Sequence, residues 1–211
     1  MNTNQSTDLI NQDAFYEMKF SNLKLEQVEL KNKTFENCQF EKSCFNEAKL
    51  IACQFIDCDF ISCNLSSVRL NHTSFSGAVF HESKLIGINW TEARWPYIKL
   101  TSPIQFHRSN ISHSSFYALD LKEIIIEDCK AHDVDFREGD FSNGNFILTD
   151  FERSQFMHTK LVSANFVEAI NYYINPNEND IRKGKFSMPD VINLLQGFEL
   201  EIQGIDESTG V

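Results

Sequence analysis

The chain has 211 residues and a mass of 24.4 kDa, enough for one domain with a small appendage. Its 19 Lys and Arg against 30 Asp and Glu give a net charge of −11. This balance argues against direct nucleic-acid binding and against a polybasic membrane-surface protein. Hydrophobic residues make up 42%, which is typical of a folded chain, and Phe is unusually abundant with 19 copies.

The first segment, residues 1–12, is predicted to be a flexible N-terminus or an N-terminal cap. Its opening residues contain no apolar core of a secretory signal, and no apolar stretch of the chain is long enough to span a bilayer. We therefore expect no membrane partner. The cysteines are expected to be reduced, and the predicted location is the cytoplasm.

From Phe15 onward, large apolar residues recur at every fifth position. The first register contains Phe, Leu and Trp only: Phe15, Phe20, Leu25, Leu30, Phe35, Phe40, Phe45, Leu50, Phe55, Phe60, Leu65, Leu70, Phe75, Phe80, Leu85, Trp90, Trp95 and Leu100. After a slip of one residue near 101–105, a second register runs on: Phe106, Ile111, Phe116, Leu121, Ile126, Ala131, Phe136, Phe141, Phe146, Phe151, Phe156, Leu161 and Phe166.

A second column, two residues before each large residue, is mostly small or β-branched, as at Cys58, Ala78 and Gly144. A period of five would wander around a helix and would break the two-residue alternation of a strand. It suits a chain that turns a corner every five residues and points the small and large side chains inward. Four units then close a coil of about 20 residues, and the coils stack about 4.8 Å apart into an all-β solenoid.

The repeat is predicted to occupy residues 13–168, and residues 169–211 to form a C-terminal cap. Residues 187–197 are predicted to be a helix, because Ser187 is a good N-cap residue, Pro189 is tolerated in the first turn and Gly197 suits the C-terminal end. Phe198, Leu200 and Ile202 alternate as in a half-buried strand. The cap covers the open end of the solenoid, or pairs two rods end to end.

The sequence resembles the pentapeptide-repeat proteins, whose repeat is usually written A-[D/N]-L-x-x. The resemblance covers Phe15 to Phe166 and implies a right-handed quadrilateral β-helix of about eight coils. Asn89-Trp90 followed by Trp95-Pro96, together with the tail, is similar to the albicidin-resistance and microcin-immunity branch, and more distantly to the quinolone-resistance proteins. No long insertion between coils, of the kind that some quinolone-resistance members carry, is visible.

The resemblance to this branch implies a function. Its members form homodimers through the C-terminal cap, mimic B-DNA in size and charge, and act on DNA gyrase. By this resemblance the partner is DNA gyrase or topoisomerase IV, and the dimer interface is assigned to five apolar residues of the tail: Ile192, Leu195, Phe198, Leu200 and Ile202. The alternative is a non-catalytic scaffold that binds another protein through a flat face of the rod.

The acidic partner-binding face is predicted by assigning units to four faces, on the assumption that the slip skips none. On this assumption one face runs from Phe15 through Phe75 and Trp95 to Phe116 and Phe156. It carries five acidic residues that we expect to contact the partner: Glu17, Glu36, Asp57, Asp135 and Glu138. The excess of negative charge on this face is mild compared with a duplex, which carries one charge per about 1.7 Å.

No motif indicates an enzyme. Five of the six cysteines occupy the small inward column, where Cys is a compact apolar filler, and Cys44 lies between the columns. Their spacing differs from that of zinc sites, and the six histidines fall on outward positions without a recognised catalytic partner. We therefore expect no catalytic residues, no cofactor and no metal.

Overall fold

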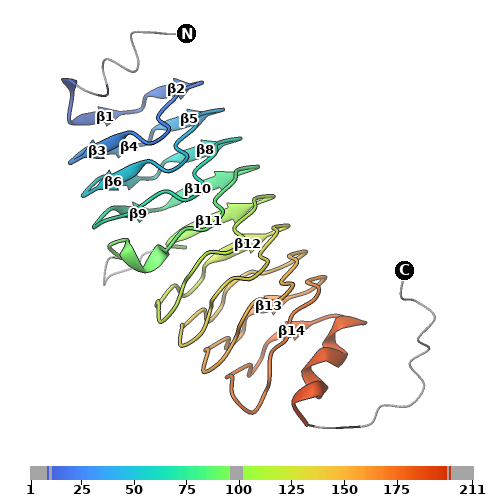
Figure 1. Cartoon of the computed structure of the whole chain (residues 1–211). Coiled ribbons are helices and arrows are strands. Elements are labelled where there is room, and N and C mark those ends of the chain that lie inside the picture. Colours follow the sequence, from blue (N-terminus) through green and yellow to red (C-terminus); the bar gives the residue numbers. More distant parts are fainter. Residues whose placement is uncertain (1–8, 10, 96–101, 199, 201–211) are drawn as a thin grey trace.

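The computed structural model describes Leu9, residues 11–95, residues 102–198 and Leu200. The chain winds into a rod of stacked coils, with the first coils at one end and a short helix at the other (Figure 1). Among these residues, no helix has the length and apolar character needed to cross a membrane. The predicted β-solenoid is confirmed.

Adjacent coils pair in parallel at an offset of 20 residues, as in Phe15 with Phe35 and Phe20 with Phe40. The strands are short because the chain turns after every unit. The described strands are β1 (Ala14–Tyr16), β2 (Lys19–Ser21), β3 (Glu29–Lys31), β4 (Thr34–Glu36), β5 (Gln39–Glu41), β6 (Lys49–Ile51), β7 (Gln54–Ile56), β8 (Asp59–Ile61), β9 (Ser74–Ser76), β10 (Ala78–His81), β11 (Ile104–His107), β12 (Ile125–Glu127), β13 (Asn165–Phe166) and β14 (Lys185–Phe186).

The core of the rod consists of aromatic ladders. The ring of Phe35 stacks between Phe15 and Phe55, with centroids 4.9 and 5.0 Å apart. Phe40, on the neighbouring face of the coil, meets Phe35 edge to face at 5.2 Å. Both geometries are favourable for aromatic pairs, so each Phe gains stacking contacts in addition to burial.

The small column fills the space between these rings and satisfies backbone groups. Thr149 Oγ1 donates to the carbonyl of Ile126 at 2.8 Å, and Ser83 Oγ donates to that of Phe60 at 3.2 Å. At Gly144, a Cβ atom would lie 2.7 Å from Cε2 of Phe146. A large side chain in this column would therefore displace the aromatic ladder.

Most corners place a residue other than Gly in the left-handed region, with φ between 47° and 63°. A typical corner is the turn in which Val28 N donates to Leu25 O at 3.2 Å, with Gln27 at φ 59°. None of these positive-φ residues is β-branched, since a branched Cβ is especially unfavourable there. The repeat accepts this local strain because the pairing of neighbouring coils holds each corner in place.

The slip in the repeat is where it was predicted, but its size was predicted wrongly. Phe80 pairs with Phe106, an offset of 26, which exceeds the regular 20 by 26 − 20 = 6 residues. The pairing therefore bypasses one complete unit together with the single extra residue. The bypassed segment follows the 3-10 helix η1 (Trp90–Glu92) and ends at Pro103, whose carbonyl accepts from Gly77 N. Leu100 lies outside the described residues.

The solenoid continues past residue 168, so the predicted boundary is too early. β14 pairs with β13, and the ring of Phe186 stacks on Phe166 at 5.3 Å and 7°. Tyr172 and Ile174 are buried in the same coil. They interrupt the five-residue spacing, which hides this last coil from a search for the repeat.

The 3-10 helix η2 (Asp190–Phe198) closes the C-terminal end. Leu194 is buried against the last coil, and Val191 packs on the same core. Ser187 is not an N-cap, since its Oγ accepts from Glu168 N at 2.8 Å. Phe198 ends the helix, so the predicted strand is wrong at this residue; Ile202 lies outside the described residues.

Candidate functional site

Three of the predicted acidic residues lie together on the N-terminal coils. Glu36 ends β4, and Glu17 and Asp57 occupy corners, with φ of 52° and 48°. The pairing of β1, β4 and β7 places these corners in one column of the rod, two coils apart. No ion pair engages any of the three among the residues that the structure describes. We call these three carboxylates the N-terminal acidic surface.

Asp135 and Glu138 lie on a different face, so the prediction of one continuous acidic face is wrong. Asn89 pairs with Ser115, and Ser115 pairs with Asp135. Asp135 therefore lies in the same column of the rod as Asn89 and Trp90. The ring of Trp90 stacks on Phe116 of that column at 5.7 Å. The physical reason is the bypassed unit, which advances the register by one face.

Asp135 is also neutralised by its own unit. Arg137 Nε and Nη2 both lie 2.9 Å from the two Asp135 oxygens, and its guanidinium covers the ring of Tyr117 at 5.9 Å. Burial raises the pKa of Asp135, but the hydrogen bonds from Arg137 outweigh it and the net direction is downward. Glu138, at a corner with φ 63°, has no ion pair in the described part of the chain.

The C-terminal helix η2, and Leu200 beyond its end, expose apolar side chains to solvent. Leu195, Phe198 and Leu200 are 39%, 45% and 59% exposed. We call these three residues the C-terminal apolar surface. Ile192 is half-buried and lines a hollow of about 220 Å³ with Pro189 and Asn193. Four of the five predicted interface residues thus lie at one end of the rod, and Ile202 is outside the described residues.

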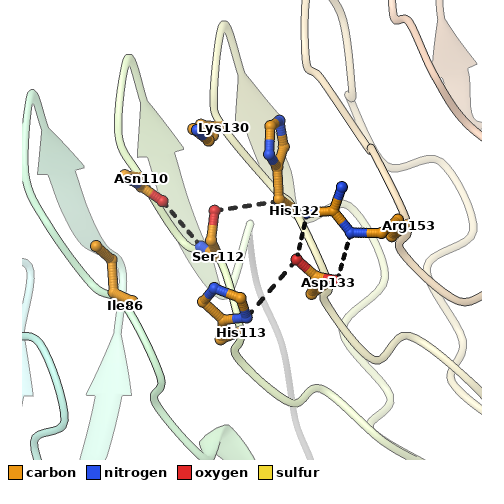
Figure 2. Close-up of a pocket in the computed structure, with 8 residues that line it drawn as sticks. All are labelled: Ile86, Asn110, Ser112, His113, Lys130, His132, Asp133 and Arg153. Atoms are coloured by element: carbon orange, nitrogen blue, oxygen red, sulfur yellow. Dashed lines mark hydrogen bonds and ion pairs between the residues drawn. The ribbon is translucent and has the colours of Figure 1, made fainter.

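Sequence reasoning did not predict a second hollow, on the side of the middle coils (Figure 2). Its lining comes from consecutive coils and encloses about 220 Å³: Ile86, Asn110, Ser112, His113, Lys130, His132, Asp133 and Arg153. Arg153 binds both oxygens of Asp133, at 2.8 and 2.9 Å. The Arg153 guanidinium holds the pKa of Asp133 below its usual range. The sequence could have indicated this ion pair, because Asp133 and Arg153 are 20 residues apart, which is the length of one coil.

The buried cysteines behave as core fillers. Burial raises the pKa of the Cys58 and Cys129 thiols to about 12 and that of Cys63 to about 11. The Cys58 thiol donates to the carbonyl of Phe35 at 3.4 Å. A neutral, enclosed thiol is a poor nucleophile and a poor metal ligand.

A family model of the pentapeptide repeat region matches residues 28–102. The repeat, the four-sided coils and this match together show that the chain is a pentapeptide-repeat protein. The comparison with curated proteins gives no match.

The rod is also similar to solved structures of QnrB1, a plasmid-mediated fluoroquinolone resistance protein. A trypsin-treated variant is 16% identical, with a TM-score of 0.63 over 90% of this chain and 92% of that chain. A second trypsin-treated variant, also 16% identical, has a TM-score of 0.58 over 90% and 97%. Full-length QnrB1, again 16% identical, has a TM-score of 0.50 over 89% and 100%. At 16% identity, this similarity shows a shared fold only.

Proposed function

We propose that this protein binds a type II topoisomerase, DNA gyrase or topoisomerase IV, in place of DNA, and thereby confers resistance or immunity to inhibitors of that enzyme. It acts as a homodimer in the cytoplasm and carries out no catalysis. The rod competes with duplex DNA for the positively charged channel of the enzyme. Complexes of inhibitor, enzyme and DNA are weakened as a result.

One observation carries this proposal: the rod resembles a fluoroquinolone resistance protein over nine tenths of both chains and has a net charge of −11. The stacked coils give the length and straightness that a DNA substitute needs (Figure 1). The negative charge favours a cationic channel over nucleic acid or an anionic membrane.

The N-terminal acidic surface is the part of the rod that we assign to the enzyme. Its carboxylates at Glu17, Glu36 and Asp57 have no cationic partner among the described residues, so their charge is available to an approaching basic surface. Asp135, in contrast, is held by Arg137 at 2.9 Å. Its charge is already largely compensated, and we assign it no contact energy.

The C-terminal apolar surface is assigned to dimerisation. A two-fold axis through η2 would bury Leu195, Phe198 and Leu200 of both copies in an isologous contact. The two N-terminal acidic surfaces would then lie at the far ends of a doubled rod. Because exposed apolar patches of this kind usually mark an interface, the arrangement also explains why these three side chains are exposed in the single chain.

Equilibrium binding to purified gyrase at several salt concentrations tests the proposal. We expect binding to weaken steeply as salt rises and duplex DNA to compete for the same site. A triple variant, Glu17→Gln with Glu36→Gln and Asp57→Asn, should bind at least about tenfold more weakly, since rim charges steer association.

A matched control removes the same charge elsewhere: Glu123→Gln, Asp128→Asn and Glu168→Gln. All three are corner residues, as Glu17 and Asp57 are, and the described residues place no ion pair on them. Equal loss in both triple variants would show that total charge rather than this surface is recognised. No binding by a folded, dimeric protein would favour a scaffold for another partner.

A further inference from the structure

Three ligand-type side chains converge on the side of the rod, between two adjacent coils. His132 Nε2 lies 2.7 Å from Asp150 Oδ2, and His132 Nδ1 lies 3.3 Å from Glu152 Oε2. One nitrogen and one oxygen from each carboxylate all lie within 4.8 Å of one another. Figure 2 shows the ring of His132 pointing away from the Asp133–Arg153 pair. Arg153 nevertheless links that pair to the cluster, because its Nη1 donates to Glu152 Oε1 while its Nε and Nη2 bind Asp133.

The backbone of the solenoid brings the three residues together. Lys130 pairs in parallel with Asp150, which sets the coil of His132 directly against the coil of Glu152. The backbone N of His132 donates to Ser112 Oγ at 3.2 Å and fixes the residue from the other side. The cluster is therefore built on paired backbone rather than on a loose loop.

The side chains are held in position as well. Asp150 Oδ1 accepts from Asn171 Nδ2 at 2.9 Å and from the backbone N of Glu152 at 3.1 Å. Its other oxygen is thereby directed at His132, whose ring is only 13% exposed. Metal-binding carboxylates and imidazoles are commonly oriented by outer hydrogen bonds of this kind.

We propose that His132, Asp150 and Glu152 form a binding site for a divalent transition-metal ion of the zinc type, with the remaining coordination position open to water. One imidazole nitrogen and two carboxylate oxygens are a mixed set that suits zinc. Calcium would require six to eight oxygen ligands, and magnesium a near-ideal octahedron of oxygens. The ion binds the imidazole nitrogen that carries no proton, together with one oxygen of each carboxylate.

The bound ion would stabilise the C-terminal end of the rod. Asn171, which holds Asp150, also donates its backbone N to Asp190 Oδ1 at 3.2 Å. Asp190 is the first residue of η2. A metal at His132 would therefore stabilise a chain of contacts that runs from the middle coils to the C-terminal helix. The site does not depend on topoisomerase binding.

The test is calorimetric titration of the full, chelator-treated protein with zinc chloride, followed by thermal melting with and without zinc. We expect one saturable site with a Kd of about 10 µM or tighter. At about 100 µM zinc the Tm should rise by about 3 °C, as a ligand at ten times its Kd stabilises a chain of this size. Calcium and magnesium should produce neither effect.

Two variants assign the site. His132→Gln and Glu152→Gln should each weaken zinc binding at least about tenfold while keeping the melting temperature of the metal-free protein. His113→Gln, on the preceding coil, and Cys44→Ser, which removes the half-buried thiol, should bind zinc as the unchanged protein does. The proposal is overturned if no saturable binding occurs below about 100 µM, if His132→Gln binds normally, or if Cys44→Ser abolishes binding.

Discussion

The aromatic ladder makes the stability of the rod depend on single rings, and Phe60 is the most informative position. Its ring is fully buried and stacks on Phe40 and Phe80 at 4.9 and 4.7 Å. Phe55 and Phe45 meet it edge to face at 5.4 and 6.2 Å. Replacement by Ala removes all four ring contacts at once.

The expected cost is worked out from these contacts. Burial of the ring contributes about 2–3 kcal/mol, and each stacked partner about 0.5–1.5 kcal/mol more. With two stacked partners, Phe60→Ala should therefore lower the free energy of unfolding by about 3–6 kcal/mol, which overlaps the range of about 3–5 kcal/mol known for Phe to Ala changes in cores. Phe60→Leu should cost less, about 1.5 kcal/mol or below, because Leu65 fills the equivalent place on the next face.

Guanidinium unfolding followed by circular dichroism measures both changes. Leu148→Ala is the control, since this large apolar residue is 48% exposed at a corner and should change stability by less than about 0.5 kcal/mol. A cost below about 1 kcal/mol for Phe60→Ala would refute the reasoning. It would mean that the stacks do not hold the coils together.

Three further predictions concern the corners, the thiols and the cap. Leu148→Val should cost about 1–2 kcal/mol by urea unfolding, because φ is 58° there. Ile147→Val, at the adjacent half-buried position, should cost about 0.5 kcal/mol or less, and equal costs would contradict the role of the corner. The contribution of the buried thiols to stability should be constant below about pH 8 and then fall by about 1.4 kcal/mol per thiol per pH unit, since the unfolded chain ionises first while burial raises the folded pKa of Cys58 to about 12. Cys58→Ala should flatten the fall in Tm between about pH 9 and 11, and an unchanged slope would contradict this. Phe198→Asp with Leu200→Asp should give monomers in sedimentation equilibrium, and a retained dimer would exclude this interface.

The periodic part of the fold could be predicted because each core position recurs independently of its neighbours. Where the period breaks, sequence alone fails for a physical reason. A unit that leaves the coil changes the register by a multiple of five, which a five-residue count cannot detect. The bypassed segment after Trp95 therefore appeared to be a one-residue slip and misplaced Asp135 and Glu138 by one face.

The same distinction between regular and interrupted parts of the repeat applies to the candidate sites. Glu17 and Asp57 were placed correctly, because no break separates them. The cluster around His132 was missed, although His132 and Glu152 are 20 residues apart and so must be neighbours on successive coils. Counting by whole coils rather than by local motifs would have found it. The exposed face of η2 required the structure, since its tail residues follow no repeat.

The most direct test of topoisomerase binding is a gyrase supercoiling assay with increasing amounts of purified protein, with and without a fluoroquinolone. We expect the protein to restore supercoiling in the presence of the drug, or to inhibit the enzyme alone. Either effect should be weaker for Glu17→Gln with Glu36→Gln and Asp57→Asn than for the matched control. No effect in either arm, from a protein shown to be folded and dimeric, would contradict the proposed function.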